Sequence, residues 1–419
     1  MSLNVSGHNI SDIYVGDDKI DKIFVGEDLV YTASNPADYY LGFHPDNPSE
    51  VCTVKLEQYM SQGTDFSKFD PPIVTPTFYY SYDCATWQPY TLGTAISIGG
   101  SNAEAVYFKG DNLSEWGGYY LDSSTLYETY AHFVLSGSVS ASGNIMSLRY
   151  SDSSDTNNTT IPCIYAFYDM FMNCTSLTTA PALPATTLAD YCYYNMFNGC
   201  TSLTTAPALP ATTLADYCYD QLFYRCTSLT TAPALPATTL ADHCYTAMFC
   251  YCPSLTTAPA LPATTLALEC YSLMFQECTS LTEAPSLPAT TLAESCYWSM
   301  FSGCTSLTTP PSLPATTLVK SCYCSMFEKC TSLTCIPKLN ATTIPDGGIF
   351  GTYSSMYKNS SVRANSTSSG VCNKEYRIPT SGTGTAGSKD LDAMFTDLAG
   401  TGTFTPSINT TFYINVPSF

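Results

Sequence analysis

The sequence predicts a repeat protein, a solenoid in which every 26-residue turn adds a short parallel strand and a short helix, preceded by an all-β N-terminal region. The main observation is that the string CTSLTTAPALPATTLADYCYYNMFNG, which begins at Cys174, recurs almost unchanged from Cys200. Equivalent cysteines follow every 26 residues as far as Cys330. A fixed period of this length is typical of chains whose units bury their apolar faces by stacking on one another.

The first half of each unit predicts a very short strand. In the unit 201–226, apolar residues recur at every third position from Leu203 to Leu209, with prolines at Pro207 and Pro210. Because proline cannot donate to a hydrogen-bonded ladder, the strand is expected to hold only about three or four residues.

The second half predicts a helix. Leu214, Cys218 and Leu222 are spaced at i, i+4 and i+8, which places them on one apolar helical face. Thr213 and Asp216 have the spacing of a capping box at the start of that helix.

A strand, a corner and a short helix per turn is the plan of leucine-rich repeats. The recurring pattern MFxxCxSLxxxPxLP, over roughly residues 160–350, resembles the surface-antigen (BspA-like) leucine-rich repeats of Bacteroides and the related repeats of bacterial surface lipoproteins. The resemblance implies binding to protein or glycan at a cell surface rather than catalysis of a reaction.

Thirteen of the twenty cysteines fall on two 26-residue ladders, one from Cys174 to Cys330 and one from Cys192 to Cys322. Zinc sites need paired cysteines joined to a second pair or to histidines. Only the pairs Cys250/Cys252 and Cys322/Cys324 are closely spaced, and the four histidines are scattered. We therefore expect most cysteines to be small, buried, unpaired residues, with structural disulfides or a metal site as the alternatives.

The chain divides into four predicted parts: an N-terminal β-hairpin or attachment module at 1–34, a β-sandwich-like module at 35–155, the repeat solenoid at 156–350 and a C-terminal cap at 351–419. The doublet ISDIYVGDDK and IDKIFVGEDL predicts short strands joined by turns. Strand-like runs such as TFYYSY, AVYFKGDN and AHFVLSGSV, separated by turn residues, predict the sandwich. A solenoid also requires a cap.

Composition narrows the function. The net charge of −20 and the pI near 4.3 argue against a nucleic-acid partner, because phosphate binding needs clustered Lys and Arg. No apolar run reaches the ~18–20 residues of a membrane span, and the start MSLNVSGHNI does not resemble a secretion signal. We expect neither membrane insertion nor export through a cleaved leader.

Catalysis is not expected. No serine or cysteine stands in a nucleophile-elbow context. The GxGxxG motif from Gly382 to Gly387 lacks the preceding strand that a dinucleotide site needs. The sequence thus predicts no catalytic residues, no metal and no cofactor. A glycan-acting enzyme is the remote alternative, because a glycosidase carboxylate pair cannot be recognised by spacing alone.

The whole-chain layout resembles structural and adhesin proteins of phages that infect gut Bacteroidales. It implies a non-enzymatic virion protein, either a tail or fibre component or a capsid decoration. The expected partners are a host cell-surface glycan or protein, or other virion subunits, within a larger assembly or homo-oligomer. The alternative is a bacterial cell-surface adhesin, which would place the chain on the cell rather than in the phage particle.

Sequence variation among the units indicates a binding face. The strand half hardly changes, whereas positions beside the buried Cys and Phe of the helix half vary and are expected to point outward. Aromatic residues and arginine are frequent anchors of interfaces. Drift at unconstrained surface positions is the alternative. The predicted binding residues are Tyr194, Asn195, Asp220, Tyr224, Arg225, Tyr251, Trp298 and Lys329.

Overall fold

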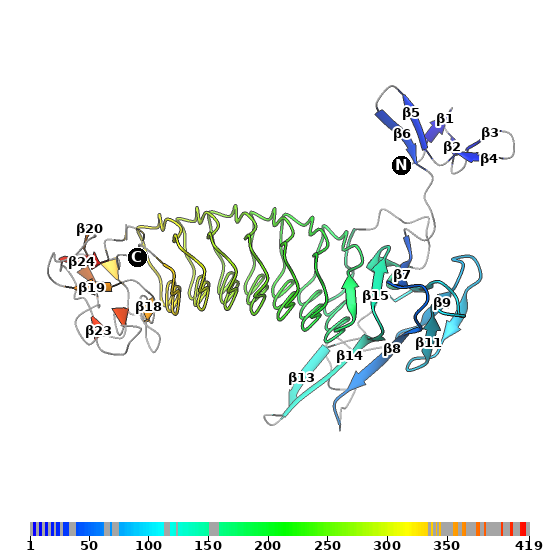
Figure 1. Ribbon diagram of the computed structural model, residues 1–419, viewed down its shortest axis with the longest axis horizontal. Helices are drawn as coiled ribbons and strands as arrows, with labels where there is room; N and C mark the ends of the chain where they lie inside the picture. Colours follow the sequence, from blue (N-terminus) through cyan, green and yellow to red (C-terminus); the bar gives the residue numbers. More distant parts are fainter. Residues whose placement is uncertain are drawn as a thin grey trace.

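The structure, a computed structural model, describes residues 39–62, 75–112, 118–122, 125–150 and 159–333, together with short strands and single residues elsewhere. Figure 1 shows a module of two β-sheets and, running away from it, a row of stacked turns formed by the repeats.

The β-module contains a six-stranded and a four-stranded sheet. The six-stranded sheet has the order β10-β9-β12-β7-β15-β16, with the bounds β7 Leu41–Pro45, β9 Phe78–Ser81, β10 Gln88–Tyr90, β12 Val106–Gly110, β15 Val139–Ser142 and β16 Leu177–Thr179. The four-stranded sheet has the order β11-β8-β14-β13, with the bounds β8 Cys52–Met60, β11 Ala95–Ile98, β13 Gly118–Asp122 and β14 Thr125–Ser136. All neighbouring strands are antiparallel except β15 and β16, which are parallel.

Aromatic side chains hold the two sheets together. Phe43 of β7 and Phe108 of β12 pack on Phe133 of β14, with ring centroids 4.7 and 5.4 Å apart. In β8 the buried residues Cys52 to Leu56 alternate with half-buried ones, as expected of a strand with one face on a core. A short 3₁₀ helix, η2 (Ile145–Leu148), follows β15, and the Asn144 side chain caps it by accepting from the Met146 amide.

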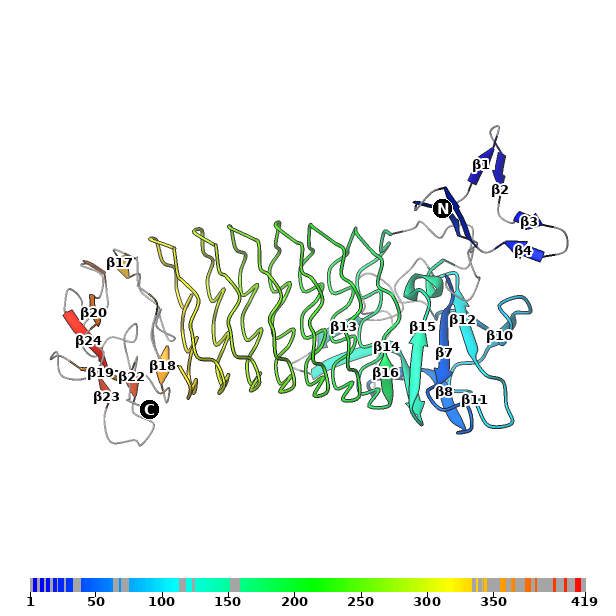
Figure 2. The ribbon, with the colours of Figure 1, turned by 45° about the horizontal axis from the view of Figure 1, so that its top comes forward.

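The β-module passes directly into the repeat stack. Strand β16 belongs to the first turns of the stack and pairs with β15, with Val139 opposite Leu177 (Figure 2). The Phe133 ring stacks on Phe171 of the repeats at 5.2 Å. Asp46 accepts hydrogen bonds from Thr178 of the stack and from two serines of the module. The module therefore covers the apolar end of the stack, which would otherwise face solvent.

The predicted leucine-rich-repeat solenoid, with one helix in each turn, is wrong. No residue of the described repeats, 159–333, lies in a helix, and the regular secondary structure described consists almost entirely of strands. In the segment 217–226 every fourth residue has a left-handed backbone, with φ of 56° at Tyr217, 54° at Gln221 and 59° at Arg225. A right-handed helix cannot contain such residues.

The hydrogen bonds of this segment explain why apolar residues at helical spacing occur here without a helix. The Leu222 amide closes a tight turn onto the Tyr219 carbonyl at 3.3 Å, whereas the Tyr219 amide donates to the Cys244 carbonyl of the next turn at 3.1 Å. Amides thus alternate between their own turn and its neighbour. A chain of four-residue turns repeats its inward positions at i, i+4 and i+8, as a helix does.

The predicted capping box is also wrong. Asp216 does not cap a helix of its own turn, because its Oδ1 accepts from the Asp242 amide of the following turn at 3.0 Å. Asp190 and Asp242 make the same contact with the residues 26 positions later. These carboxylates bind one turn to the next.

The strand half is shorter than predicted. Among residues 159–333 only β16 forms a strand, and later turns are joined by single parallel bridges such as Thr205 to Thr231 and Thr231 to Thr257. The proline two residues after each threonine, such as Pro207, lacks an amide hydrogen and prevents a longer ladder.

The interior of the stack consists of columns of identical side chains. The leucines that recur every 26 residues from Leu177 to Leu333 are at most 1% exposed. Phenylalanine rings from Phe171 to Phe327 lie parallel, with centroids 5.3–5.7 Å apart. In the ladder that contains Cys174 and Cys330, each thiol from Cys200 onward donates to a phenylalanine carbonyl 29 residues earlier.

The packing role predicted for the cysteines is confirmed. Every described cysteine is a free thiol, and all except Cys84 are buried. Burial raises the pKa of the Cys270 and Cys322 thiols to about 12, so these groups stay protonated at neutral pH.

Both ends of the chain contain short strands. Three antiparallel pairs lie near the N-terminus: β1 Leu3–Val5 with β2 His8–Ile10, β3 Ile13–Val15 with β4 Asp18–Ile20, and β5 Lys22–Val25 with β6 Asp28–Thr32. The C-terminal strands are β17 Thr343–Ile344, β18 Tyr357–Lys358, β19 Arg363–Asn365, β20 Lys374–Arg377, β21 Ser381–Gly382, β22 Phe395–Thr396, β23 Thr403–Phe404 and β24 Thr411–Asn415. The domain boundaries at 34, 155 and 350 stay predictions.

Candidate functional site

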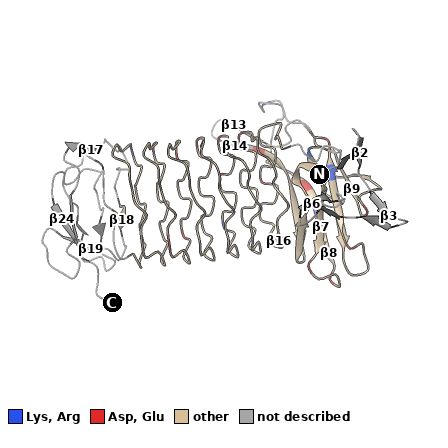
Figure 3. Cartoon of the chain, turned by 90° about the horizontal axis from the view of Figure 1, so that it is seen from above, with Lys and Arg blue, Asp and Glu red and all other residues tan. Residues whose placement is uncertain are grey.

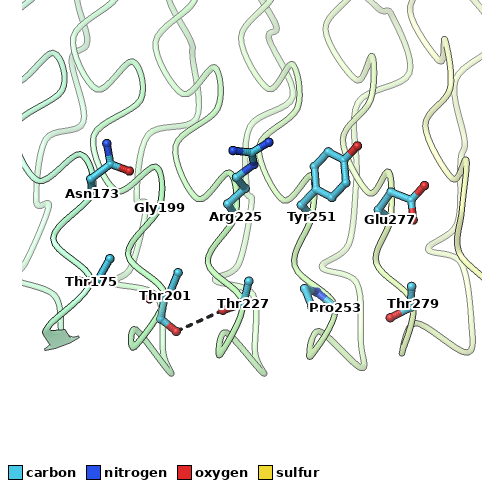
Figure 4. A pocket seen from close by; sticks show the side chains of 10 residues that line it. All are labelled: Asn173, Thr175, Gly199, Thr201, Arg225, Thr227, Tyr251, Pro253, Glu277 and Thr279. Carbon is cyan, nitrogen blue, oxygen red and sulfur yellow. Dashed lines mark hydrogen bonds between the residues drawn. The ribbon is translucent and has the colours of Figure 1, made fainter.

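A groove runs along the repeat stack beside the ladder cysteines. It spans five successive turns and has a volume of about 460 Å³, within the roughly 300–1,000 Å³ of small-ligand sites. Figure 4 shows its two rows of side chains, one just before each cysteine and one just after it. The lining residues are Asn173, Gly199, Arg225, Tyr251 and Glu277 in the first row, and Thr175, Thr201, Thr227, Pro253 and Thr279 in the second.

The backbone of the first row fixes where its side chains stand. Asn173, Arg225, Tyr251 and Glu277 have φ of 59–60°, and Gly199 has a φ of 75°. This left-handed residue reverses the chain between a buried phenylalanine and a buried cysteine, so its side chain projects outward. The Arg225 amide donates to the Cys250 carbonyl of the next turn at 2.9 Å, which ties the position to its neighbour.

Glycine in this row makes room for the preceding turn. A Cβ added at Gly199 would collide with the Asn173 side chain, and one added at Gly303 would collide with the Glu277 carboxylate. The Asn173 amide and the Glu277 carboxylate therefore lie over the following turns, and they line the first and last turns of the groove.

Arginine and tyrosine form the centre of the groove. The Arg225 guanidinium carbon lies 5.2 Å from the centroid of the Tyr224 ring and 5.6 Å from that of Tyr251. The two rings meet edge to face at 5.7 Å. Cation–π contacts of this kind orient a guanidinium while its edge stays in water. Tyr251 is 41% exposed, and Arg225 is exposed.

Arg225 is one of few cations in the stack, and it has no ion-pair partner among the described residues. Charged residues are sparse along the stack (Figure 3), and residues 159–333 include only three Lys and Arg residues. Of these, Lys320 pairs with Glu294 at 2.5 Å, and Lys329 lies outside the groove-lining set. Arg225 makes no ion pair with any described residue. Its guanidinium is therefore available to an anionic group.

Tyr194, Asn195 and Asp220 form a separate, more buried network. Gln221 Nε2 donates to the Tyr194 hydroxyl at 3.2 Å, and Asn198 Nδ2 donates to Asn195 Oδ1 at 2.9 Å. The prediction that these positions point outward is wrong for Asp220, which is only 4% exposed. In a chain of four-residue turns this position faces the interior rather than the solvent face of a helix.

The Asp220 carboxyl is an unusual interior group. Its Oδ1 has no hydrogen-bond partner among the described residues. Desolvation raises the pKa of Asp220 to about 8, against an opposing effect of the Gln221 side chain. Asp169, which the sequence did not indicate, is 3% exposed, and desolvation together with Glu128 raises its pKa to about 8.

The structure brings together only part of the predicted face. Arg225 and Tyr251 line the groove, and Tyr224 contacts both of them from outside the lining. Trp298 is half-buried in a later turn, and Lys329 stands exposed four turns beyond Arg225. Sequence reasoning missed Asn173, Gly199 and Glu277. The signal was present, because all three occupy the same variable position just before the ladder cysteine as Arg225 does.

The described residues include no cluster of three or more His, Cys, Asp or Glu side chains that could share a metal ion. Nor does that part of the chain contain a helix with the length and apolarity required to cross a bilayer. Comparisons with protein-family models, with curated proteins and with solved structures found no match.

Proposed function

We propose that this chain is a non-enzymatic binding protein of a phage particle, and that its groove attaches to a host cell-surface glycan or protein or to another virion subunit. The observation that carries the binding role is the exposed Arg225, which contacts two tyrosine rings and lines a groove of ligand size. The placement in a virion rests on the resemblance of the whole-chain layout to phage structural proteins.

The rigidity of the groove supports a binding role. Amides of Arg225, Tyr251 and Glu277 each donate to a carbonyl of the following turn, at 2.8–2.9 Å. A site whose backbone is already ordered loses little conformational entropy when a ligand binds. Arginine and tyrosine are also among the residues whose removal most weakens interfaces.

The chemistry of the thiols supports the non-enzymatic part of the proposal. A cysteine nucleophile must be a thiolate in contact with solvent. The ladder cysteines of the described repeats are buried, and burial raises the pKa of Cys270 and Cys322 to about 12. They are suited to packing rather than to attack on a substrate.

Cell-binding assays test the proposal. Fluorescently labelled full-length protein would be incubated with gut Bacteroidales cells and measured by flow cytometry. The double variant Arg225→Ala/Tyr251→Ala should lose at least tenfold in binding. Lys320→Ala removes a cation that does not line the groove and serves as the matched control. Equal binding by wild type and double variant would show that the groove is not the attachment surface.

The location requires a second measurement. Immunogold labelling of purified phage particles with an antibody against the β-module should place gold on the tail, fibre or capsid. Gold on cells grown without phage, together with unlabelled particles, would favour the alternative, a bacterial cell-surface adhesin that uses the same groove.

A further inference from the structure

We infer that the groove takes a glycan with an isolated acidic sugar, whose carboxylate pairs with Arg225. This inference rests on the proposed binding function and specifies the ligand class for the same groove.

The acidic group follows from the environment of Arg225. It is the only cation among the ten lining residues, and it has no carboxylate partner among the described residues. The Arg225 guanidinium lies over the rings of Tyr224 and Tyr251 and hydrogen-bonds to the Tyr224 side chain. Its five N–H donors lie in one plane, so the donors that Tyr224 does not use can still pair with a ligand. This planar edge matches a carboxylate in two parallel hydrogen bonds.

The sugar follows from the rest of the lining. Apart from the residues with charged or amide side chains, the lining consists of four threonines, one tyrosine, one proline and one glycine, with no Leu, Ile, Val, Phe or Met. The exposed carbon of this lining comes from threonine methyls, a proline ring and a tyrosine ring, whereas a protein hot spot usually fills a pocket with larger side chains. Threonine hydroxyls suit sugar hydroxyls, and the exposed ring of Tyr251 suits the C–H face of a sugar.

The shape of the groove fits an extended chain. The buried rings of Phe223, Phe249 and Phe275, one from each successive turn, lie 5.7 Å apart, a repeat that is close to the length of one sugar residue. Thr227 Oγ1 donates to the Thr201 carbonyl at 3.4 Å, so its lone pairs can still accept hydrogen bonds from a ligand. Four of the five turns thus offer a threonine hydroxyl to a sugar, and Pro253 replaces it in the fourth.

Glu277 limits how acidic the ligand can be. It lines the groove two turns beyond Arg225, where its carboxylate repels a second acidic group. A polymer with an acid on every sugar would place like charges beside Glu277. An acidic sugar followed by neutral sugars avoids this repulsion.

Titration calorimetry with three probes tests this ligand class on the full chain. The probes are sialyllactose, with one terminal acidic sugar, neutral lactose, and an oligogalacturonate with an acid on every sugar. We expect sialyllactose to bind at least tenfold more tightly than lactose. Arg225→Ala should remove this preference, and Arg225→Lys should keep part of it, because a point charge replaces a bidentate pair. Glu277→Gln should improve oligogalacturonate binding, and Lys320→Ala should change nothing.

Two outcomes would overturn the inference without refuting the proposed function. One is equal binding of sialyllactose and lactose, or a preference that survives Arg225→Ala. The other is failure of all three probes to bind while Arg225→Ala/Tyr251→Ala still abolishes attachment to cells, which would indicate a protein partner. Loss of groove-dependent attachment itself would refute the proposed function instead.

Discussion

Replacing Phe249 with alanine should destabilise the chain by about 3–5 kcal/mol, the usual effect of removing a fully buried phenylalanine. Its ring has no solvent exposure and lies between Phe223 and Phe275, each 5.7 Å away and parallel within 8°. Neighbouring turns cannot move in to fill the cavity, because amides such as that of Phe249 fix the spacing between turns, donating to the Met274 carbonyl at 3.0 Å. We therefore expect the cavity to stay largely open and the free energy of unfolding to fall by an amount in this range.

Urea denaturation followed by circular dichroism would measure this loss. Tyr251→Ala, two residues away but 41% exposed, is the control and should stay within about 0.5 kcal/mol of wild type. Because each turn contacts only its neighbours, hydrogen exchange should accelerate most around residues 223 and 275 and least around 327. A loss below about 1 kcal/mol, or acceleration spread evenly along the stack, would refute the reasoning.

Two further predictions concern buried titratable groups. Burial raises the pKa of Asp220 and Asp169 to about 8; above about pH 4 the unfolded chain loses protons that the folded chain keeps, so stability should fall between about pH 4 and 8. Asp220→Asn and Asp169→Asn should each remove part of this fall in stability, and the double variant should remove more. If the urea midpoint changes equally between pH 5 and pH 8 in wild type and in the double variant, this prediction is wrong. Among the described cysteines only Cys84, which is half-buried, should react with a thiol reagent in the native chain. Because burial and Asp83 raise the pKa of Cys84 to about 11, its labelling should be slow at pH 8 and faster at higher pH, which mass spectrometry of alkylated peptides would show. Rapid native labelling of Cys226 or other ladder cysteines would contradict their burial.

The period and the inward positions could be predicted from the sequence, because burial requires the same residue type in every turn. Leu203, Phe223 and Cys226 recur for that reason and are fully buried. The helix could not be excluded by spacing, because four-residue turns and an α-helix place the same residues inside. Gly199, Gly303 and Asn173 at one recurring position were the available sign of a left-handed residue, since glycine and asparagine adopt that conformation most readily.

The candidate site depends on the same hydrogen bonds that replace the helix. In an α-helix the Arg225 amide would bond within its own turn, and turns could shift relative to one another. Here it donates to the Cys250 carbonyl, so the distance from Arg225 to Tyr251 is set by backbone contacts rather than by side-chain packing. The predicted helix was enough to identify Arg225 as exposed. It did not predict that Arg225 lines a groove with Asn173 and Glu277, or that Asp220 is buried. Because the backbone of the groove is ordered before a ligand arrives, side-chain substitutions in it should alter affinity without changing the spacing of the turns.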